Sequence, residues 1–142
     1  MQGNSSYRSN RSYIKKNMQP GDTMSWSRTF TEEDIALFAK VSGDQGEHHL
    51  APNEQGRLMA HGLLTATLPT KIGGDLNLIA REMTFRFHRP VFAGDTIECV
   101  VTLTSAEQGD GFLSIVTAWK CTNQHGKEVM TGGGSGIIRD RV

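Results

Sequence analysis

Two stretches in the first half of the chain carry residue types that can move protons. Asp44 and His49 lie in a glycine-bearing stretch, residues 41–50, and Gly62 opens a long apolar stretch that follows. A carboxylate and an imidazole can each give or take a proton. A main-chain N–H at the start of a helix can face a developing negative charge. Together these residues predict an acid–base site for a carbonyl substrate.

Each of these residues also has a purely structural interpretation. Asp44 could cap the turn after a helix, because aspartate is common there, and Gly62 could serve only for close packing. We favour catalysis because Asp44 and His49 occur together, with a helix start nearby. His48 is expected to be a solvent-facing neighbour, and Glu47 an exposed charge or an alternative base.

A helix is predicted directly before this pair. Thr31 followed by Asp34 forms a capping-box pattern at its start. Gly43 is a natural residue to end it. The apolar residues that repeat along one face are Ile35, Phe38 and Val41.

A second helix is predicted over residues 58–68, which are almost all apolar or small. Such a helix should be buried on all sides. His61 in this stretch is more readily interpreted as a buried, hydrogen-bonded imidazole than as a catalyst. Pro69 is expected to end or kink the helix, and Gly73 and Gly74 to complete the break.

The remaining segments predict strands, because apolar residues alternate with polar ones. Strands are expected over residues 23–30, 83–88, 96–104, 113–121 and 127–138. The last of these contains four glycines. Glycine in a strand indicates the close approach of another backbone, and we expect this backbone to be the buried helix.

The order of these elements predicts an α+β fold. One antiparallel sheet wrapped around one long apolar helix buries that helix without a second layer. This is a hotdog-like architecture. Its exposed sheet edges favour pairing into a homodimer or a dimer of dimers.

Length and composition limit the possible classes of protein. The chain has 142 residues, 37% hydrophobic and 21% charged, which suits one folded domain. We expect residues 20–142 to form it and residues 1–19 to be a disordered basic tail. The tail carries four of the 15 basic residues, too few to predict binding to nucleic acid. No stretch is apolar enough to predict a membrane span or a secretory signal, so a cytoplasmic location is expected. In that compartment Cys99 and Cys121 should stay reduced.

Four stretches, taken in their order along the chain, resemble the MaoC-like, (R)-specific enoyl-CoA hydratase family. The stretches are residues 38–44 with His49, 60–65, 85–96 and 123–129. The resemblance implies a hotdog fold and the reversible hydration of a trans-2-enoyl thioester carried on coenzyme A or on an acyl carrier protein. It implies neither a metal nor a cofactor, and no partner that is a nucleic acid or a membrane.

The same resemblance assigns roles to particular residues. Asp44 and His49 would move the protons of one water molecule, and the Gly62 N–H would stabilise the thioester oxygen. The residues that would bind substrate are His61, Leu63, Thr65 and Arg89. Arg89 could instead be structural, or could contact the phosphates of the carrier.

The chain departs from the family pattern at three places. Gly46 and Glu47 stand where an Asn-Pro pair is common, the connection from His49 to Ala60 looks short, and Pro69 interrupts the helix. Two alternatives therefore stay open. The same parts could direct water at the carbonyl, which would make a thioesterase, or the fold could bind acyl thioesters without turnover.

Overall fold

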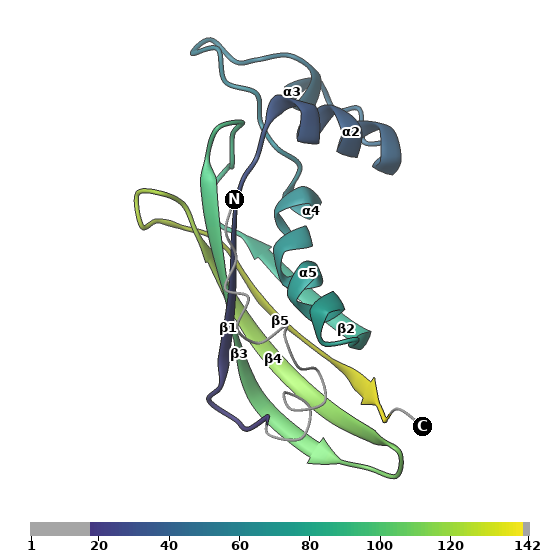
Figure 1. The fold of residues 1–142 in the computed structure, drawn as a ribbon. Helices are drawn as coiled ribbons and strands as arrows, with labels where there is room; N and C mark the ends of the chain where they lie inside the picture. Colours follow the sequence, from purple (N-terminus) through teal and green to yellow (C-terminus); the bar gives the residue numbers. More distant parts are fainter. Residues whose placement is uncertain (1–17, 141–142) are drawn as a thin grey trace.

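The computed structural model describes residues 18–140, which form one antiparallel sheet with helices on one face and at one end (Figure 1). The strand order in the sheet is β1-β3-β4-β5-β2. The strands are β1 (Thr23–Thr29), β2 (Ile79–Phe87), β3 (Thr96–Gln108), β4 (Phe112–Thr122) and β5 (Glu128–Arg139). The helices are α2 (Glu32–Ser42), α3 (Glu47–Leu50), α4 (Gly62–Thr65) and α5 (Thr67–Asp75). The predicted α+β class is thus confirmed, whereas most of the predicted tail, residues 1–17, lies outside the described residues.

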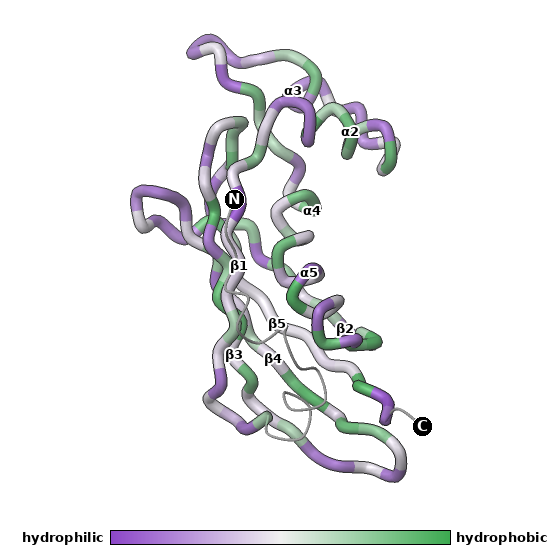
Figure 2. Tube along the Cα trace, viewed as in Figure 1, coloured by the Kyte–Doolittle hydropathy of each residue, from purple (hydrophilic) through white to green (hydrophobic). Residues whose placement is uncertain are grey.

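The two long central strands bury one face each. In β3 the buried residues are Ile97, Cys99, Val101 and Leu103, and in β4 they are Leu113, Ile115, Thr117, Trp119 and Cys121. This confirms the predicted alternation. The helix α5 packs against β1 and β3, and the apolar stretches of α5, β3 and β4 are visible in Figure 2.

The helix α2 begins and ends where the sequence predicts. The Asp34 N–H donates to the Thr31 hydroxyl at 3.1 Å, and the Thr31 N–H donates to the Asp34 carboxylate at 2.9 Å. Gly43 ends the helix with φ 78°, a conformation that favours glycine. The predicted apolar face is wrong at Val41, which is 78% exposed. Ala39, four residues after Ile35, is buried instead.

The second helix differs from its prediction in three ways. It starts at Gly62, because His61 before it is extended, and a turn at Ala66 divides it into α4 and α5. It is not buried on all sides, since Leu63 is 56% exposed. Pro69 does not end the helix but lies in the first turn of α5, shortly after the turn at Ala66, where helical N–H groups have no acceptor within the helix.

The glycines of β5 serve strand pairing. A Cβ atom on Gly132 would lie 2.0 Å from the Thr84 carbonyl oxygen, and one on Gly136 would lie 2.3 Å from that of Ile79. Both carbonyls belong to β2, which pairs with β5. The expectation that the helix approaches these glycines is therefore wrong, although a close backbone approach does occur.

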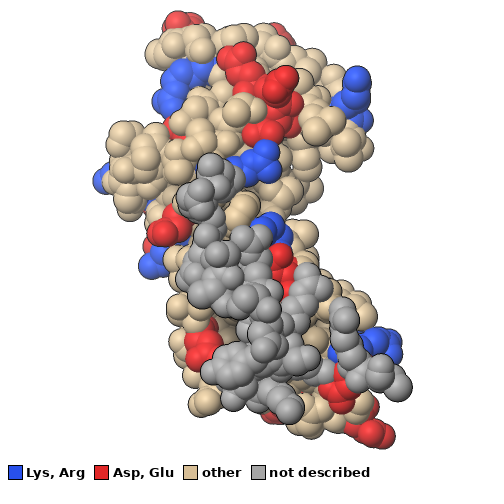
Figure 3. Space-filling model, viewed as in Figure 1, with Lys and Arg blue, Asp and Glu red and all other residues tan. Residues whose placement is uncertain are grey.

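The strand β2 is an edge strand with exposed apolar side chains. Ile79, Met83 and Phe87 are 49%, 38% and 52% exposed. Met83 and Phe87 share one side of the strand, because side chains alternate along it, whereas Ile79 lies before a register shift between Ala80 and Glu82. On the face drawn in Figure 3, basic and acidic side chains of the described residues are mixed. Among the described residues, no helix combines the length and apolar character needed to cross a membrane.

Candidate active site

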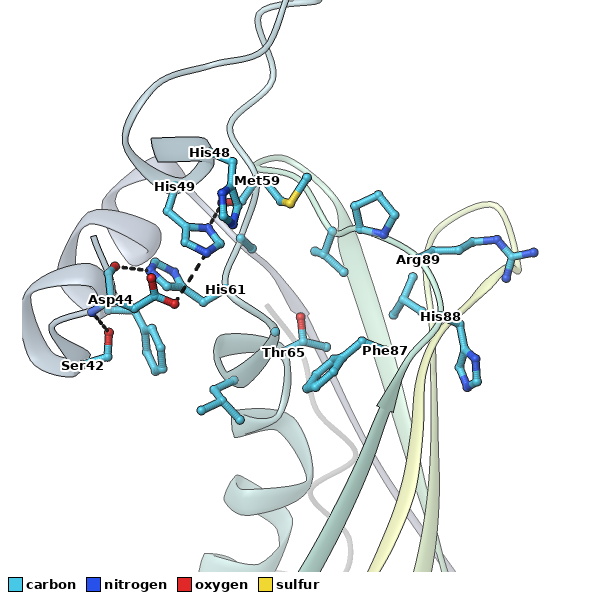
Figure 4. Close-up of a pocket in the computed structure, with 17 residues that line it drawn as sticks. Ser42, Asp44, His48, His49, Met59, His61, Thr65, Phe87, His88 and Arg89 are labelled. Atoms are coloured by element: carbon cyan, nitrogen blue, oxygen red, sulfur yellow. Dashed lines mark hydrogen bonds and ion pairs between the residues drawn. The ribbon is translucent and has the colours of Figure 1, made fainter. Parts of the chain in front are cut away.

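A cavity of about 600 Å³ lies where α2, α3, the start of α4 and the end of β2 meet (Figure 4). All of the residues that the sequence assigns to the site line this cavity. They are Asp44, His49, His61, Gly62, Leu63, Thr65 and Arg89. The structure thus brings together side chains from four segments of the chain.

The ring of His49 is held from one side by the main chain. His49 lies in α3 and is 6% exposed, and its Nδ1 lies 2.8 Å from the Met59 carbonyl oxygen. Because a carbonyl only accepts hydrogen bonds, Nδ1 carries the proton. In the neutral ring, Nε2 is then a free acceptor. It faces the Asp44 carboxylate, with 3.7 Å between Nε2 and Oδ2.

Asp44 lies in the loop between α2 and α3, and its side chain is 55% exposed. The loop is shaped by local hydrogen bonds. The Asp44 N–H donates to the Ser42 hydroxyl at 3.0 Å, and the Gly46 N–H donates to Asp44 Oδ1 at 3.1 Å. The second carboxylate oxygen, Oδ2, therefore points toward His49 while Oδ1 is engaged in the loop.

The space between these two groups suits a water molecule. A separation of 3.7 Å is too long for a direct hydrogen bond. Moreover, the Asp44 carboxylate and Nε2 of neutral His49 are both acceptors. One water can donate a hydrogen to each, which would orient its oxygen lone pairs away from the pair. The arrangement can take a proton from that water as its oxygen attacks a substrate.

Met59 is positioned by the buried carboxylate of Asp95. Asp95 accepts hydrogen bonds from the Phe92 N–H at 2.9 Å, from Gln124 Nε2 at 2.8 Å and from Arg57 Nη2 at 3.3 Å. The guanidinium of Arg57 also lies over the Phe92 ring, 4.2 Å from its centre. These contacts hold the segment before α4 on the sheet. They therefore also hold the Met59 carbonyl, which sets the tautomer of His49.

The imidazole rings of His48, His49 and His61 lie close together. His49 and His61 are stacked, with ring centres 3.7 Å apart and 19° between the planes. His48 is exposed, as predicted, and its ring is tilted by 54° against that of His49. His61 is 2% exposed, and its Nε2 lies 3.0 Å from the Asp44 carbonyl oxygen.

Asp44, His49 and His61 also form a group that could be considered for a metal ion, since one ligand atom from each lies within 4.8 Å of the others. The stacked rings argue against shared coordination. An imidazole binds a metal in its own plane, and nearly parallel planes do not meet at one ion. The group suits proton transfer better than metal binding.

The start of α4 lies at the cavity. Gly62 is the first residue of α4, so its N–H has no acceptor within the helix. A Cβ atom there would lie 2.8 Å from a carbon of the Phe87 ring. Glycine thus allows Phe87 to close over the helix start. Leu63 beside it is exposed, whereas Thr65 is buried at 2%.

Arg89 lies on the rim of the cavity, after β2. Its Nη1 donates to the Glu128 carbonyl oxygen at 2.7 Å, and the side chain is exposed. The hydrogen bond anchors the guanidinium to β5 and leaves part of it open to solvent. Both interpretations of Arg89, structural and phosphate-binding, are compatible with this position.

Met59 and Phe87 are among the lining residues that the sequence did not assign to the site. Met59 acts through its main-chain carbonyl, which no side-chain pattern could reveal. Phe87 lies in the strand that the sequence predicts over residues 83–88. The alternation along a strand predicts which side chains share a side, but not that Phe87 reaches α4.

Comparison with known proteins identifies the family to which this chain belongs. Residues 18–132 match the family described as FAS1-like, dehydratase domain region. The chain belongs to this hydratase and dehydratase family. An (R)-specific enoyl-CoA hydratase from Rhodospirillum rubrum is 30% identical over 127 residues, which cover 82% of this chain and 85% of the relative. A mitochondrial 3-hydroxyacyl-[acyl-carrier-protein] dehydratase from Arabidopsis thaliana is 25% identical, covering 82% and 74%.

The fold is also that of two solved (R)-hydratases. An (R)-hydratase from Pseudomonas aeruginosa in the unliganded form has a TM-score of 0.74 at 25% identity, covering 90% of this chain and 86% of that one. An (R)-hydratase from A. caviae has a TM-score of 0.73 at 23% identity, covering 89% and 99%. These likenesses confirm the predicted MaoC-like hotdog fold. The roles of the individual site residues stay predictions.

Proposed function

We propose that this protein catalyses the reversible hydration of a trans-2-enoyl thioester to an (R)-3-hydroxyacyl thioester. One observation carries the proposal. The Met59 carbonyl holds His49 Nδ1, so that Nε2 and Asp44 Oδ2 face one space across 3.7 Å. Membership in a family of hydratases and dehydratases supports it, as does the activity named for the Rhodospirillum rubrum relative.

In the proposed reaction Asp44 and His49 hold one water and move its protons. One of the two groups removes a proton as the water oxygen forms a bond to C3 of the substrate. The electron pair of the C2–C3 double bond moves toward the thioester oxygen, giving an enolate. A proton then returns from the pair to C2, which completes the addition of water, and dehydration follows the same steps in reverse.

The Gly62 N–H is proposed to donate to the thioester oxygen as that oxygen gains negative charge. A preorganised donor of this kind stabilises the transition state more than the ground state. It lies at the cavity, as do the two residues that would contact the acyl group, Leu63 and Thr65. His61 lines the same wall. Arg89 on the rim could meet a phosphate of the carrier, whether coenzyme A or the prosthetic group of a carrier protein.

Hydration can be measured by the loss of the ultraviolet band of the conjugated enoyl thioester, with crotonyl-CoA as the first substrate. We expect wild type to turn over. Asp44→Asn and His49→Ala should each lower kcat by about a hundredfold, the scale of a general acid–base residue. His125→Ala and Asp110→Asn, both in exposed turns between strands, are the matched controls and should retain wild-type turnover.

The outcomes separate the proposal from its alternatives. Near-normal turnover in folded Asp44→Asn would refute the assigned role of Asp44. Release of free thiol from an acyl-CoA, detected with a thiol reagent, would indicate a thioesterase. Saturable binding of enoyl-CoA without turnover, for short and long acyl chains, would indicate a binding module.

We further propose that the protein works as a homodimer joined through the open edge of β2. Exposed Ile79, Met83 and Phe87 support this, because an apolar sheet edge favours pairing. Phe87 also lines the cavity, so a second copy on β2 would lie close to the substrate. The expected cytoplasmic location and the expected lack of a cofactor stay predictions.

A further inference from the structure

His61 lies beneath the proposed catalytic pair and contacts both of its members. Its side chain is 2% exposed. Its Nε2 lies 3.0 Å from the main-chain oxygen of Asp44, and its ring stacks on that of His49 at 3.7 Å. A residue so deeply buried is better placed to act on Asp44 and His49 than on a substrate.

The hydrogen bonds of His61 fix which nitrogen carries the proton. The Asp44 carbonyl can only accept, so Nε2 is the donor. In the neutral ring Nδ1 is then an acceptor, and it is buried without a hydrogen-bond partner among the described residues. An unpaired buried acceptor costs stability. Phenylalanine could fill the same space without this cost, so packing alone does not account for a histidine here.

The contact to Asp44 bears directly on the geometry of the pair. The Asp44 side chain is 55% exposed, and among the described residues its carboxylate accepts a hydrogen bond only from the Gly46 N–H. The position of Oδ2 therefore depends on where the main chain of Asp44 is held. His61 holds that main chain at the Asp44 carbonyl, whereas Ser42 holds it at the Asp44 N–H.

We propose that His61 is a positioning residue, which sets the separation between Asp44 Oδ2 and His49 Nε2 through its N–H bond to Asp44 and its ring contact with His49. This proposal rests on the proposed function for its kinetic consequence. A shift of either group would misplace the bound water relative to C3 of the substrate. Misplacement by about 1 Å can cost about a hundredfold in rate.

The test compares amides of two lengths at position 61. The amide nitrogen of glutamine occupies nearly the place of Nε2, so His61→Gln can still donate to the Asp44 carbonyl. The amide nitrogen of asparagine occupies the place of Nδ1 and cannot reach it. His61→Phe keeps a ring against His49 but has no donor. Ile115→Val, which removes one methylene from the core on β4, controls for a loss of stability alone.

We expect His61→Asn and His61→Phe to lower kcat for crotonyl-CoA by about tenfold or more, with KM changed by less than about twofold. His61→Gln should recover most of kcat, and Ile115→Val should match wild type. Equal kcat values for folded His61→Gln and His61→Asn would overturn the proposal. So would wild-type kcat in His61→Phe.

A second measurement does not need activity. Amide hydrogen exchange reports the order of the loop through Gly46, whose N–H donates to Asp44 Oδ1, and His49, whose N–H donates to the Gly46 carbonyl. Exchange at both should be faster in His61→Asn than in His61→Gln. If wild type hydrates no enoyl thioester but this difference is found, the proposed function fails and the positioning geometry stands. If wild type is active and neither kcat nor exchange differs between the two variants, only the positioning role fails.

Discussion

At the scale of residues, the two members of the proposed pair lie in unlike surroundings. The Asp44 side chain is 55% exposed, whereas that of His49 is 6% exposed. Water can therefore reach the carboxylate, while the imidazole is held by Met59 on one edge and by the His61 ring on one face. A solvated carboxylate and a fixed imidazole can present two acceptors to one water without a direct contact between them.

The buried cysteines allow a prediction from their pKa. Cys99 and Cys121 lie opposite each other in the register of β3 and β4. The hydrogen bond to Cys121 and the burial of the site raise the pKa of the Cys99 thiol. A raised pKa means a smaller thiolate fraction at any given pH, and the thiolate is the form that reacts.

Native protein should therefore resist alkylation of Cys99 by iodoacetamide at about pH 8, the pKa range of a free thiol. The same protein in denaturant should be alkylated at both cysteines, which mass spectrometry would detect. Labelling of Cys99 in the native protein as fast as in denaturant would contradict the prediction.

At the scale of elements, two glycines with opposite surroundings form a matched pair. Gly74 lies in α5, and nothing lies within 4 Å of a Cβ atom placed there. Gly132 lies in β5, where a Cβ atom would meet the Thr84 carbonyl oxygen at 2.0 Å. Gly74→Ala should stabilise the protein by about 0.4–1 kcal/mol, by reducing the freedom of the unfolded chain. Gly132→Ala should destabilise it by about 1–3 kcal/mol or more, because β2 and β5 must separate.

Urea unfolding of the two variants and wild type measures both changes in the free energy of unfolding. Since each variant adds one methyl group to one glycine, their difference reports the surroundings alone. If Gly132→Ala were as stable as wild type, the close approach of β2 to β5 would be wrong.

The sequence predicted those elements whose pattern depends on local rules. The alternation in residues 96–104 and 113–121 reports burial directly, since side chains of a strand alternate between its faces. The capping box at Thr31 and the helix end at Gly43 are equally local. The start of α4 is not, because residues 58–60 are apolar for contacts with the sheet end rather than for a helix. Those contacts include hydrogen bonds between residues 58–60 and the segment after β2.

The residues that the sequence assigns to the candidate site line one cavity, but the geometry of that cavity was not predicted. Asp44 lies in the loop before α3 and His49 lies in α3, five residues further along the chain, so their proximity follows from spacing. The hydrogen bond from His49 Nδ1 to the Met59 carbonyl oxygen depends on how the segment before α4 returns over α3. No residue type in the sequence predicts this path of the chain. The stacking of His61 on His49 likewise arises only when α4 docks beside the loop.

At the scale of the whole molecule, the sheet has two edge strands, β1 and β2. The strand β2 pairs with β5 on one side only, and it carries the exposed apolar residues Ile79, Met83 and Phe87. An antiparallel pairing of two copies centred on Thr84 would place Glu82 of each opposite Arg86 of the other, so the edge is complementary to itself in charge.

Size-exclusion chromatography with light scattering should therefore show that wild type is a dimer or an assembly of dimers. Met83→Arg puts a charge at the centre of the proposed contact and should shift the protein to monomer. Crotonyl-CoA hydration should fall with it, because Phe87 at the end of the same strand lines the cavity. Leu37→Arg, at an exposed leucine of α2, adds the same charge elsewhere and should change neither the mass nor the rate. A wild type that is monomeric and active would show that one chain builds the site alone, and β2 would then need another explanation for its apolar edge.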